Sequence, residues 1–236
     1  MKYKYLLWDI DGTILDFLAA ERAAMQFLFL KYGFGECDEK KLSKYSAINV
    51  KYWQALERGE LTRSEILVGR FREFFEEEGF DVSLAEAFNQ DYQITLGDTV
   101  VFCDDSYELL KKLKSEGYIL YAITNGTKTA QDRKLRKSGF IDIFEKVFIS
   151  EVVGIEKPGR EFFDAVMADG GIEDKGLALV IGDSLTSDIL GGNNAGIDTC
   201  WYNPFGSENT TGAMVKYEIS NLWDVEKILC EKFCGV

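Results

Sequence analysis

The chain has 236 residues, of which 46% are hydrophobic and 28% charged, an ordinary globular balance that excludes a disordered or low-complexity protein. Its formal net charge of −13 argues against a nucleic-acid polymer as partner, because binding a phosphate backbone requires clustered Lys and Arg. The chain has no His, which excludes Ser-His-Asp hydrolases and His-ligated metal sites, so any catalysis must use carboxylates, hydroxyls and Lys.

The first predicted element is a buried strand over Tyr3–Trp8, an apolar run too short for a signal peptide. No apolar run approaches the roughly 20 residues that a membrane helix needs, so we expect a cytoplasmic protein without membrane contact. After this strand, residues 17–96 hold amphipathic helical segments and no convincing strand. These segments are Ala19–Tyr32, Glu39–Leu56, Arg63–Glu78 and Leu84–Thr95. The sequence therefore predicts an all-helical insertion after the first strand.

Beyond residue 96, apolar strands alternate with helix-period stretches. The predicted strands are Tyr118–Ile123, Val147–Ile149, Leu177–Ile181 and Thr199–Tyr202, and the helical stretches are Ser106–Ser115, Thr129–Lys137, Glu161–Ala168 and Ile189–Ala195. This alternation predicts an α/β fold with a Rossmann-like parallel sheet and helices on both faces. Residues 1–16 and 97–236 are predicted to form this core domain, and residues 17–96 a helical cap domain.

Chemically capable groups follow the strong strands. Asp9 and Asp11 follow the first, Thr124-Asn125-Gly126 the second, Lys157 comes after the third, and Asp183 follows the fourth. The carboxyl ends of parallel strands border one crevice, so these groups are expected to converge there.

Each group taken alone has a simpler interpretation. Asp9, Asp11, Thr124 and Asp183 each precede a predicted helix that they could cap, and Lys157 could be an ordinary exposed cation. If the strand continues, Asp9 and Asp11 face the same side, where either a cation bridges them or one keeps a proton. Asp183 and Asp188 could complete an oxygen-rich Mg²⁺ site. Their joint order on successive strands favours a functional site over the capping interpretation.

This ordered set resembles the four motifs of the haloacid dehalogenase superfamily. The motifs appear here as Asp9-Ile10-Asp11-Gly12-Thr13, Thr124-Asn125, Lys157-Pro158, and Gly182-Asp183-Ser184 with Asp188. The resemblance spans nearly the whole chain and includes the helical cap after the first strand.

For the acids, the resemblance implies an Mg²⁺-dependent hydrolase of phosphate monoesters. Asp9 would attack phosphorus to form an aspartyl-phosphate and would also bind the metal. Asp11 would give its main-chain carbonyl to the metal, while its carboxyl group protonates the leaving oxygen and then activates water. Asp183 would be the further metal ligand.

The remaining motif residues would act on the phosphoryl group. Thr124 and the amide of Asn125 would hold its oxygens, and Lys157 would neutralise charge on nucleophile and phosphate. Asp188 would orient Lys157 or a metal-bound water. Phosphoryl transfer needs mainly alignment and charge neutralisation, which such a site supplies.

Within the superfamily, the carboxylate at position 11 favours ester hydrolysis over dehalogenation. The stretches Asp16–Ala24, Asp188–Gly196 and Thr199–Asn203 resemble the pyrimidine nucleoside monophosphatase branch, which implies a nucleotide substrate. Phe17, Tyr45, Tyr52 and Trp53 could stack a base, although aromatic residues at helical spacing more often form core. Phosphonate hydrolases of similar shape use a cap Lys, for which Lys31, Lys40, Lys41, Lys44 and Lys51 are the candidates.

Three alternatives stay open at this stage. One is a sugar-phosphate phosphatase or phosphomutase of the same superfamily, since cap residues decide the substrate. Another is a phospho-accepting signalling module, although receiver domains are about half this length and lack the insertion. The third is a phosphate-binding protein without turnover. We expect a small-molecule phosphate ester as partner and a monomer or homodimer.

Overall fold

The computed structural model describes residues 2–230 and contains a six-stranded sheet in which every pair of neighbours is parallel. The strand order is β3-β2-β1-β4-β5-β6. The strands are β1 (Tyr5–Trp8), β2 (Ile119–Thr124), β3 (Lys146–Ile149), β4 (Ala178–Gly182), β5 (Asp198–Tyr202) and β6 (Tyr217–Ile219). The predicted fold class is confirmed, and β6 is an additional three-residue edge strand that the sequence did not indicate.

Helices connect the strands and form the cap. They are α1 (Phe17–Lys31), α2 (Glu39–Glu57), α3 (Arg63–Glu78), α4 (Ala85–Asp98), α5 (Ser106–Ser115), α6 (Lys128–Ser138), α7 (Ser150–Val153), α8 (Arg160–Gly170), α9 (Leu190–Ala195) and α10 (Val225–Cys230), with a π-helical turn over Leu185–Ile189. Within residues 2–230, no helix combines the length and the apolar character needed to cross a membrane.

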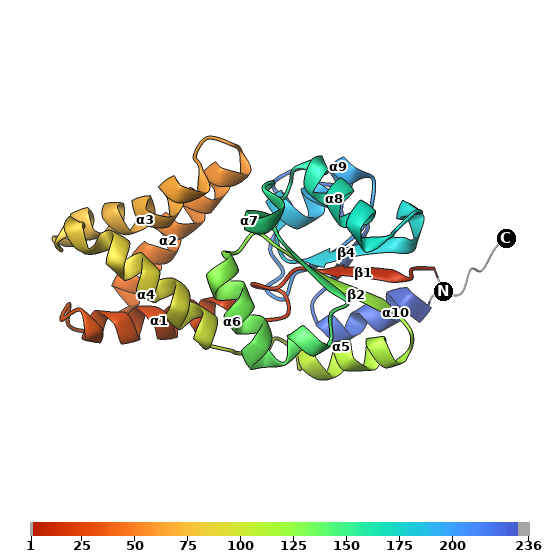
Figure 1. Cartoon of the computed structure of the whole chain (residues 1–236), viewed down its shortest axis with the longest axis horizontal. Helices are drawn as coiled ribbons and strands as arrows, with labels where there is room; N and C mark the ends of the chain where they lie inside the picture. Colours follow the sequence, from red (N-terminus) through yellow and green to blue (C-terminus); the bar gives the residue numbers. More distant parts are fainter. Residues whose placement is uncertain (1, 231–236) are drawn as a thin grey trace.

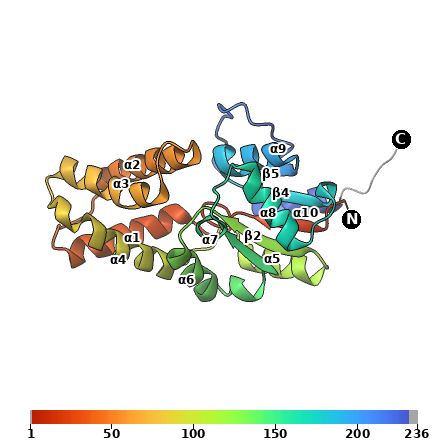
Figure 2. The ribbon, with the colours of Figure 1, turned by 45° about the horizontal axis from the view of Figure 1, so that its top comes forward.

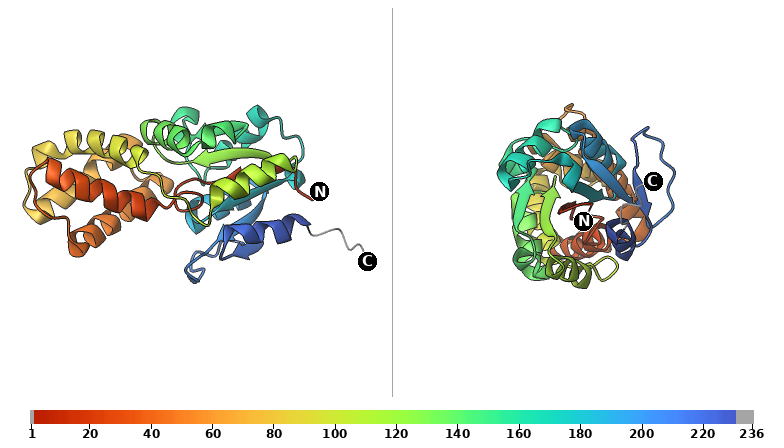
Figure 3. Two further views of the ribbon diagram at one scale, coloured as in Figure 1. Left: turned by 90° about the horizontal axis from the view of Figure 1, so that it is seen from below. Right: turned by 90° about the vertical axis from the view of Figure 1, so that its right-hand side faces the viewer.

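The sheet is buried on both faces because its strands alternate side chains between two layers of helices. Leu6 and Trp8 of β1 belong to a hydrophobic cluster with α5 and α10, whereas Leu7 belongs to a second cluster with α8 and α9. Figure 1 shows α8 and α9 on one side of the sheet and α5 and α10 on the other, and the end-on view in Figure 3 shows the same layers.

Helices α1 to α4 have a hydrophobic cluster of their own, which is rich in Phe and Tyr. Figure 2 shows α2 and α3 packed together above α1 and α4. The side chains of Asp16, Asp38 and Thr62 cap the first three of these helices, and Thr62 forms a full capping box with Glu65. The division into core and cap after residues 16 and 96 stays a prediction, and α4 itself continues to Asp98.

The strand order reverses direction between β1 and β4, since β2 and β3 extend the sheet on one side and β5 and β6 on the other. Parallel sheets open a crevice at such a point, at the carboxyl ends of the strands. In Figure 1, β1 runs toward the cap helices. This edge of the sheet therefore faces the cap.

Candidate active site

The predicted site residues lie at the cap-facing edge of the sheet. Asp9 and Asp11 follow β1, Thr124 is the last residue of β2, Lys157 comes after α7, and Asp183 follows β4. The main-chain N–H of Asp9 donates to the carbonyl of Ile181 (2.9 Å), which keeps the chain beside β4 for one residue after β1 ends. The helices that follow these strands are capped by other residues: Asp16 caps α1, Thr127 caps α6, and Ser184 caps the π-helical turn. Capping therefore does not account for Asp9, Thr124 or Asp183.

Lys157 is the buried centre of the site, with 1% of its side chain exposed. Its Nζ donates to Asp9 Oδ1 (2.7 Å), Asp188 Oδ1 (2.7 Å) and the carbonyl of Ile123 (3.0 Å). Burial lowers the pKa of Lys157, but the carboxylates of Asp188 and Asp9 more than offset this and raise it above its ordinary value. The ammonium group is therefore held in its charged form between two acids.

Asp9, Asp183 and Asp188 form an acidic cluster in which one carboxylate oxygen of each lies within 4.8 Å of the others. Burial raises the pKa of Asp9, and the charge of Asp188 raises it further. Burial likewise raises the pKa of Asp183, followed by the charges of Asp9 and Asp188. Asp9 and Asp188 are buried and Asp183 is partly buried. Three such acids beside one ammonium group lack positive charge, and a close set of carboxylate oxygens is what a hard divalent cation prefers.

Thr13 joins the first and fourth motifs, a role that sequence analysis did not assign. Its hydroxyl lies 3.1 Å from Asp9 Oδ2 and 3.2 Å from Asp183 Oδ1, and it accepts the main-chain N–H of Asp183 (3.0 Å). Gly12, at φ +91°, lets the chain turn here, and a Cβ at this residue would lie 2.5 Å from Asp183 Oδ2. The glycine thus allows Asp183 to approach the Asp9 loop.

Thr124 and Asn125 form the loop between β2 and α6. Thr124 is buried, and its Oγ1 accepts the N–H of Gly126 (3.0 Å). The side chain of Asn125 pairs with the main chain of Lys157, donating from Nδ2 to its carbonyl (2.8 Å) and accepting its N–H at Oδ1 (2.9 Å). This reciprocal pair fixes the second motif against the third, so Asn125 has its main-chain N–H rather than its carboxamide to offer a ligand.

The carboxylate of Asp11 lies apart from the acidic cluster, beside α6. It accepts from Gln131 Nε2 (2.6 Å) and forms an ion pair with Lys134. Both partners are buried polar residues of the α6 face that packs toward the site, and sequence analysis missed them. The sequence signal that could have indicated them is their helical spacing, which places them on the same face of α6 as Ala130 and Leu135.

The site residues line a cavity of about 270 Å³ that is roofed by the cap. From the cap, its lining includes Phe17, Asn49, Val50, Trp53, Gln54 and Glu57. Glu57 accepts from the hydroxyl of Thr186 (2.8 Å). The pKa of Glu57 is raised to about 7, mainly by burial. The hydrogen bond from Thr186 lowers this pKa, and the charge of Asp188 raises it further.

Of the four aromatic residues considered for base stacking, Phe17 and Trp53 line this cavity, whereas Tyr45 is fully buried in the cap cluster. Tyr52 also packs against that cluster. The five candidate Schiff-base lysines of the cap are absent from the described lining. Four of them pair with acids elsewhere: Lys31 with Asp91, Lys41 with Asp38, Lys44 with Glu78 and Lys51 with Glu73.

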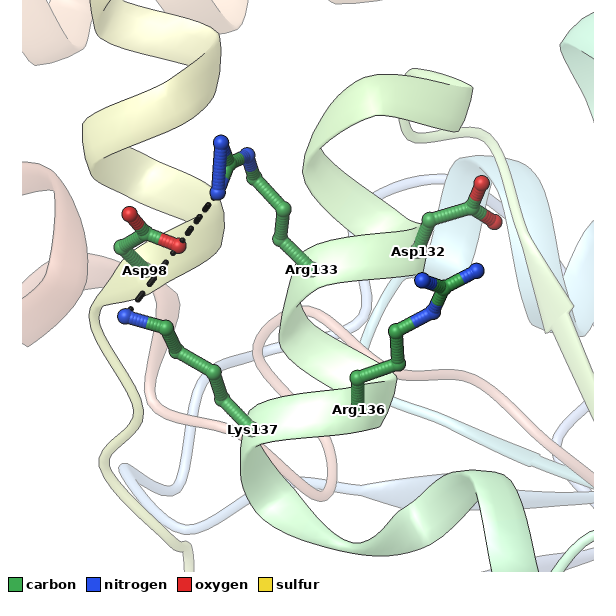
Figure 4. Close-up of a pocket in the computed structure, with 5 residues that line it drawn as sticks. All are labelled: Asp98, Asp132, Arg133, Arg136 and Lys137. Atoms are coloured by element: carbon green, nitrogen blue, oxygen red, sulfur yellow. Dashed lines mark hydrogen bonds and ion pairs between the residues drawn. The ribbon is translucent and has the colours of Figure 1, made fainter.

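A second cavity, of about 400 Å³, lies between α4 and α6 (Figure 4). Its lining consists of Asp98, Asp132, Arg133, Arg136 and Lys137. Asp98, at the end of α4, accepts from Arg133 (2.9 Å) and pairs with Lys137 (3.2 Å), so exposed ion pairs link the last cap helix to the core. None of the predicted site residues takes part in these described contacts.

The chain is similar to known hydrolases in sequence and in structure. The profile of the haloacid dehalogenase-like hydrolase family matches residues 6–202. The chain is 37% identical to the HAD-hydrolase YfnB of Bacillus subtilis (strain 168), over 97% of this chain and 96% of that protein. A crystal structure of YfnB, described as bound to magnesium and revealing interdomain movement, superposes with a TM-score of 0.90 at 35% identity, covering 97% of this chain and 99% of that one.

Two further relatives cover almost the full chain. The pyrimidine 5'-nucleotidase PynA of Streptococcus pneumoniae (strain ATCC BAA-255 / R6) is 38% identical over 95% of this chain and 94% of its own. The pyrimidine 5'-nucleotidase YjjG of Escherichia coli (strain K12) is 31% identical over 98% of this chain and 100% of its own.

Proposed function

The chain belongs to the haloacid dehalogenase-like hydrolase family, and from this we propose that it is an Mg²⁺-dependent phosphatase of pyrimidine nucleoside 5'-monophosphates. The observation that carries the proposal is the contact of Lys157 Nζ with both Asp9 and Asp188, at 2.7 Å each, at the floor of a roofed cavity. A carboxylate held beside a buried ammonium group can approach a phosphate dianion that it would otherwise repel.

The residues present fit a divalent cation. Asp9 and Asp183 offer carboxylate oxygens, and the three acids of the cluster outnumber the single ammonium group beside them. We propose that Asp9, Asp183 and the main-chain carbonyl of Asp11 hold Mg²⁺. The bound ion would supply positive charge that neutralises the phosphoryl oxygens.

In the proposed reaction an oxygen of Asp9 attacks phosphorus and the bond to the nucleoside 5'-oxygen breaks. The leaving oxygen takes a proton from the carboxyl group of Asp11. The resulting aspartyl-phosphate is attacked by water, which gives its proton to Asp11, and inorganic phosphate leaves as the Asp9 carboxylate is restored. To act this way, Asp11 exchanges its contacts with Gln131 and Lys134 for the leaving oxygen.

The other motif residues hold the phosphoryl group in line. The hydroxyl of Thr124 and the main-chain N–H of Asn125 would donate hydrogen bonds to the phosphoryl oxygens. Lys157 would neutralise their charge. Asp188 keeps Lys157 in place through the 2.7 Å contact. Phosphoryl transfer depends mainly on such alignment and charge neutralisation.

Two observations support a pyrimidine nucleotide as substrate. Two relatives that cover nearly the whole chain carry the name pyrimidine 5'-nucleotidase. In addition, the cap side of the cavity offers the rings of Phe17 and Trp53 and the carboxamide of Gln54, groups able to stack on a base and to pair with its polar edge.

The test is a phosphate-release screen of the purified protein with Mg²⁺, using uridine, thymidine, cytidine and purine nucleoside monophosphates together with hexose phosphates. We expect kcat/KM to be highest for the pyrimidine nucleotides. The Asp9→Asn variant is expected to be inactive, whereas Asp132→Asn, an exposed acid of α6, is expected to match the wild type. Faster turnover of hexose phosphates would refute the nucleotide substrate, and an active Asp9→Asn variant would refute the nucleophile.

A further inference from the structure

Arg63, the first residue of α3, reaches from the cap into the core with 13% of its side chain exposed. Its Nη1 donates to the carbonyls of Asn125 (2.9 Å) and Gly126 (3.3 Å). Its Nη2 donates to Ser150 Oγ (2.6 Å), and its guanidinium group forms a two-pronged ion pair with Glu156. One cap side chain thus binds three separate core segments.

Two of these segments carry predicted phosphate-binding residues. Asn125 and Gly126 directly follow Thr124, and Glu156 directly precedes Lys157. The side chain of Asn125 already pairs with the main chain of Lys157. The guanidinium group therefore spans the two loops from the cap side, at the point where they are joined to each other.

The contact with Asn125 also orients the hydroxyl of Thr124. The C=O and N–H of a trans peptide unit point in opposite directions, so fixing the carbonyl of Asn125 fixes the N–H of Gly126. That N–H donates to Thr124 Oγ1 (3.0 Å). With its oxygen accepting from the protein, the hydroxyl has its proton free to donate to a phosphoryl oxygen.

Arg63 does not itself line the described cavity, but its guanidinium carbon lies 5.7 Å from the ring centre of Trp53, which does. Arg63 therefore contacts two parts of the cavity lining from outside, the ring of Trp53 and the loop of residues 124–127. Such a residue acts through its neighbours and not on the substrate.

We propose that Arg63 is a positioning residue that sets the loop of residues 124–127 for phosphate binding, and does so only while the cap is closed on the core. This inference rests on the proposed phosphatase function. Moving α3 away from the core removes every hydrogen bond that Arg63 makes to this loop and to Glu156. Cap closure and the geometry of the phosphate site are thereby coupled through one side chain.

The test compares Arg63→Met and Arg63→Lys with Arg133→Gln, which removes an exposed cap–core ion pair of α6 (Figure 4) that makes no described contact with the loop. We expect Arg63→Met to lower kcat on the order of 10- to 100-fold, because small misplacements of binding groups cost that much. Arg63→Lys keeps the positive charge near Glu156 but lacks the planar guanidinium group. Compared with Arg63→Met, it should therefore regain thermal stability but not kcat. Arg133→Gln should change kcat by less than about twofold.

A second readout does not depend on activity. Amide hydrogen exchange of the peptide covering residues 124–127 should become about tenfold faster in Arg63→Met and stay unchanged in Arg133→Gln. The positioning role would be overturned if exchange and kcat were unchanged in Arg63→Met, or if exchange rose and kcat fell equally in Arg133→Gln. A wild-type protein that releases no phosphate from any ester would refute the proposed function, and the exchange comparison would still decide the role of Arg63 in the loop.

Discussion

Replacing Lys157 by Met is expected to lower the free energy of unfolding by about 4 kcal/mol at pH 7 in the absence of metal. Lys157 is the shared partner of Asp9 and Asp188, and Asp188 is completely buried. Without the ammonium group, one of these carboxylates must take up a proton to remain in the site. For an Asp with an ordinary pKa near 3.9, this costs about 1.4 kcal/mol for each pH unit above that value, hence about 4 kcal/mol at pH 7. Breaking a buried ion pair typically costs about 3–5 kcal/mol.

The sign of the pH dependence follows from the same reasoning. The variant forces a proton onto a folded-state carboxyl group that the unfolded chain releases near its ordinary pKa, so the loss grows as pH rises. At pH 5 it should shrink to about 1.5 kcal/mol.

Urea unfolding in EDTA at pH 5 and pH 7 measures both values. Lys128→Met is the matched control, since Lys128 pairs with Asp132 on the exposed face of α6 and should contribute less than about 1 kcal/mol. The double variant Lys157→Met/Asp188→Asn removes the surplus acid and should be more stable than Lys157→Met at pH 7. A loss below about 1 kcal/mol, or one of equal size at both pH values, would refute this account of the buried charges.

Three further results are expected. The folded-state pKa of Glu57 is raised to about 7 from 4.5, so the folded state favours the protonated form. The free energy of unfolding of the wild type should therefore fall by up to about 3 kcal/mol relative to Glu57→Gln as pH rises from 4.5 to 8. Equal urea midpoints for the two proteins across this range would contradict this. A Cβ in Gly182→Ala would lie 2.3 Å from the side chain of Asp188. The free energy of unfolding of this variant should therefore fall by about 1–3 kcal/mol, and most of its phosphatase activity should be lost. Melting curves and phosphate release measure the two effects. Mg²⁺ should raise the melting temperature of the wild type in a concentration-dependent way and leave that of Asp183→Asn nearly unchanged; an equal rise in both would argue against the metal site.

The sheet was predictable because each strand is an apolar run of a few residues followed by a polar group. The run Tyr3–Trp8 ending in Asp9 is the clearest example, and it became β1. Sequence analysis did not assign β6 or α10. The three residues of β6 include Glu218 and so lack the continuous apolar run of the other strands. The structure brings Asp9, Lys157, Asp183 and Asp188 together at one edge of the sheet, while their chemical roles stay predictions.

The cap contacts could not be predicted, because they depend on how two packed units meet. Within α2, however, the helical period separates residues that sequence analysis grouped. Tyr45 and Tyr52 are seven residues apart and point the same way within about 20°, whereas Trp53 is turned by about 100° from Tyr52. Accordingly Tyr45 and Tyr52 pack on the cap cluster, and Trp53 lines the cavity. Arg63 and Glu57 give no such signal, since a charged residue at a helix end is usually exposed.

A protein with a net charge of −13 that binds a phosphate dianion has to overcome repulsion both overall and locally. In the described site, Lys157 already shares its charge between Asp9 and Asp188, and Lys134 is paired with Asp11, so both buried ammonium groups are already engaged by acids. Burial makes this more severe, since the pKa of both Asp9 and Asp183 is raised and their charged forms are disfavoured without further positive charge. A divalent cation would relieve both costs at once, because it would stabilise the ionised form of Asp9, the proposed nucleophile, and attract the phosphate that Asp9 would repel. Metal and phosphate should therefore bind with positive cooperativity, each increasing the affinity of the site for the other.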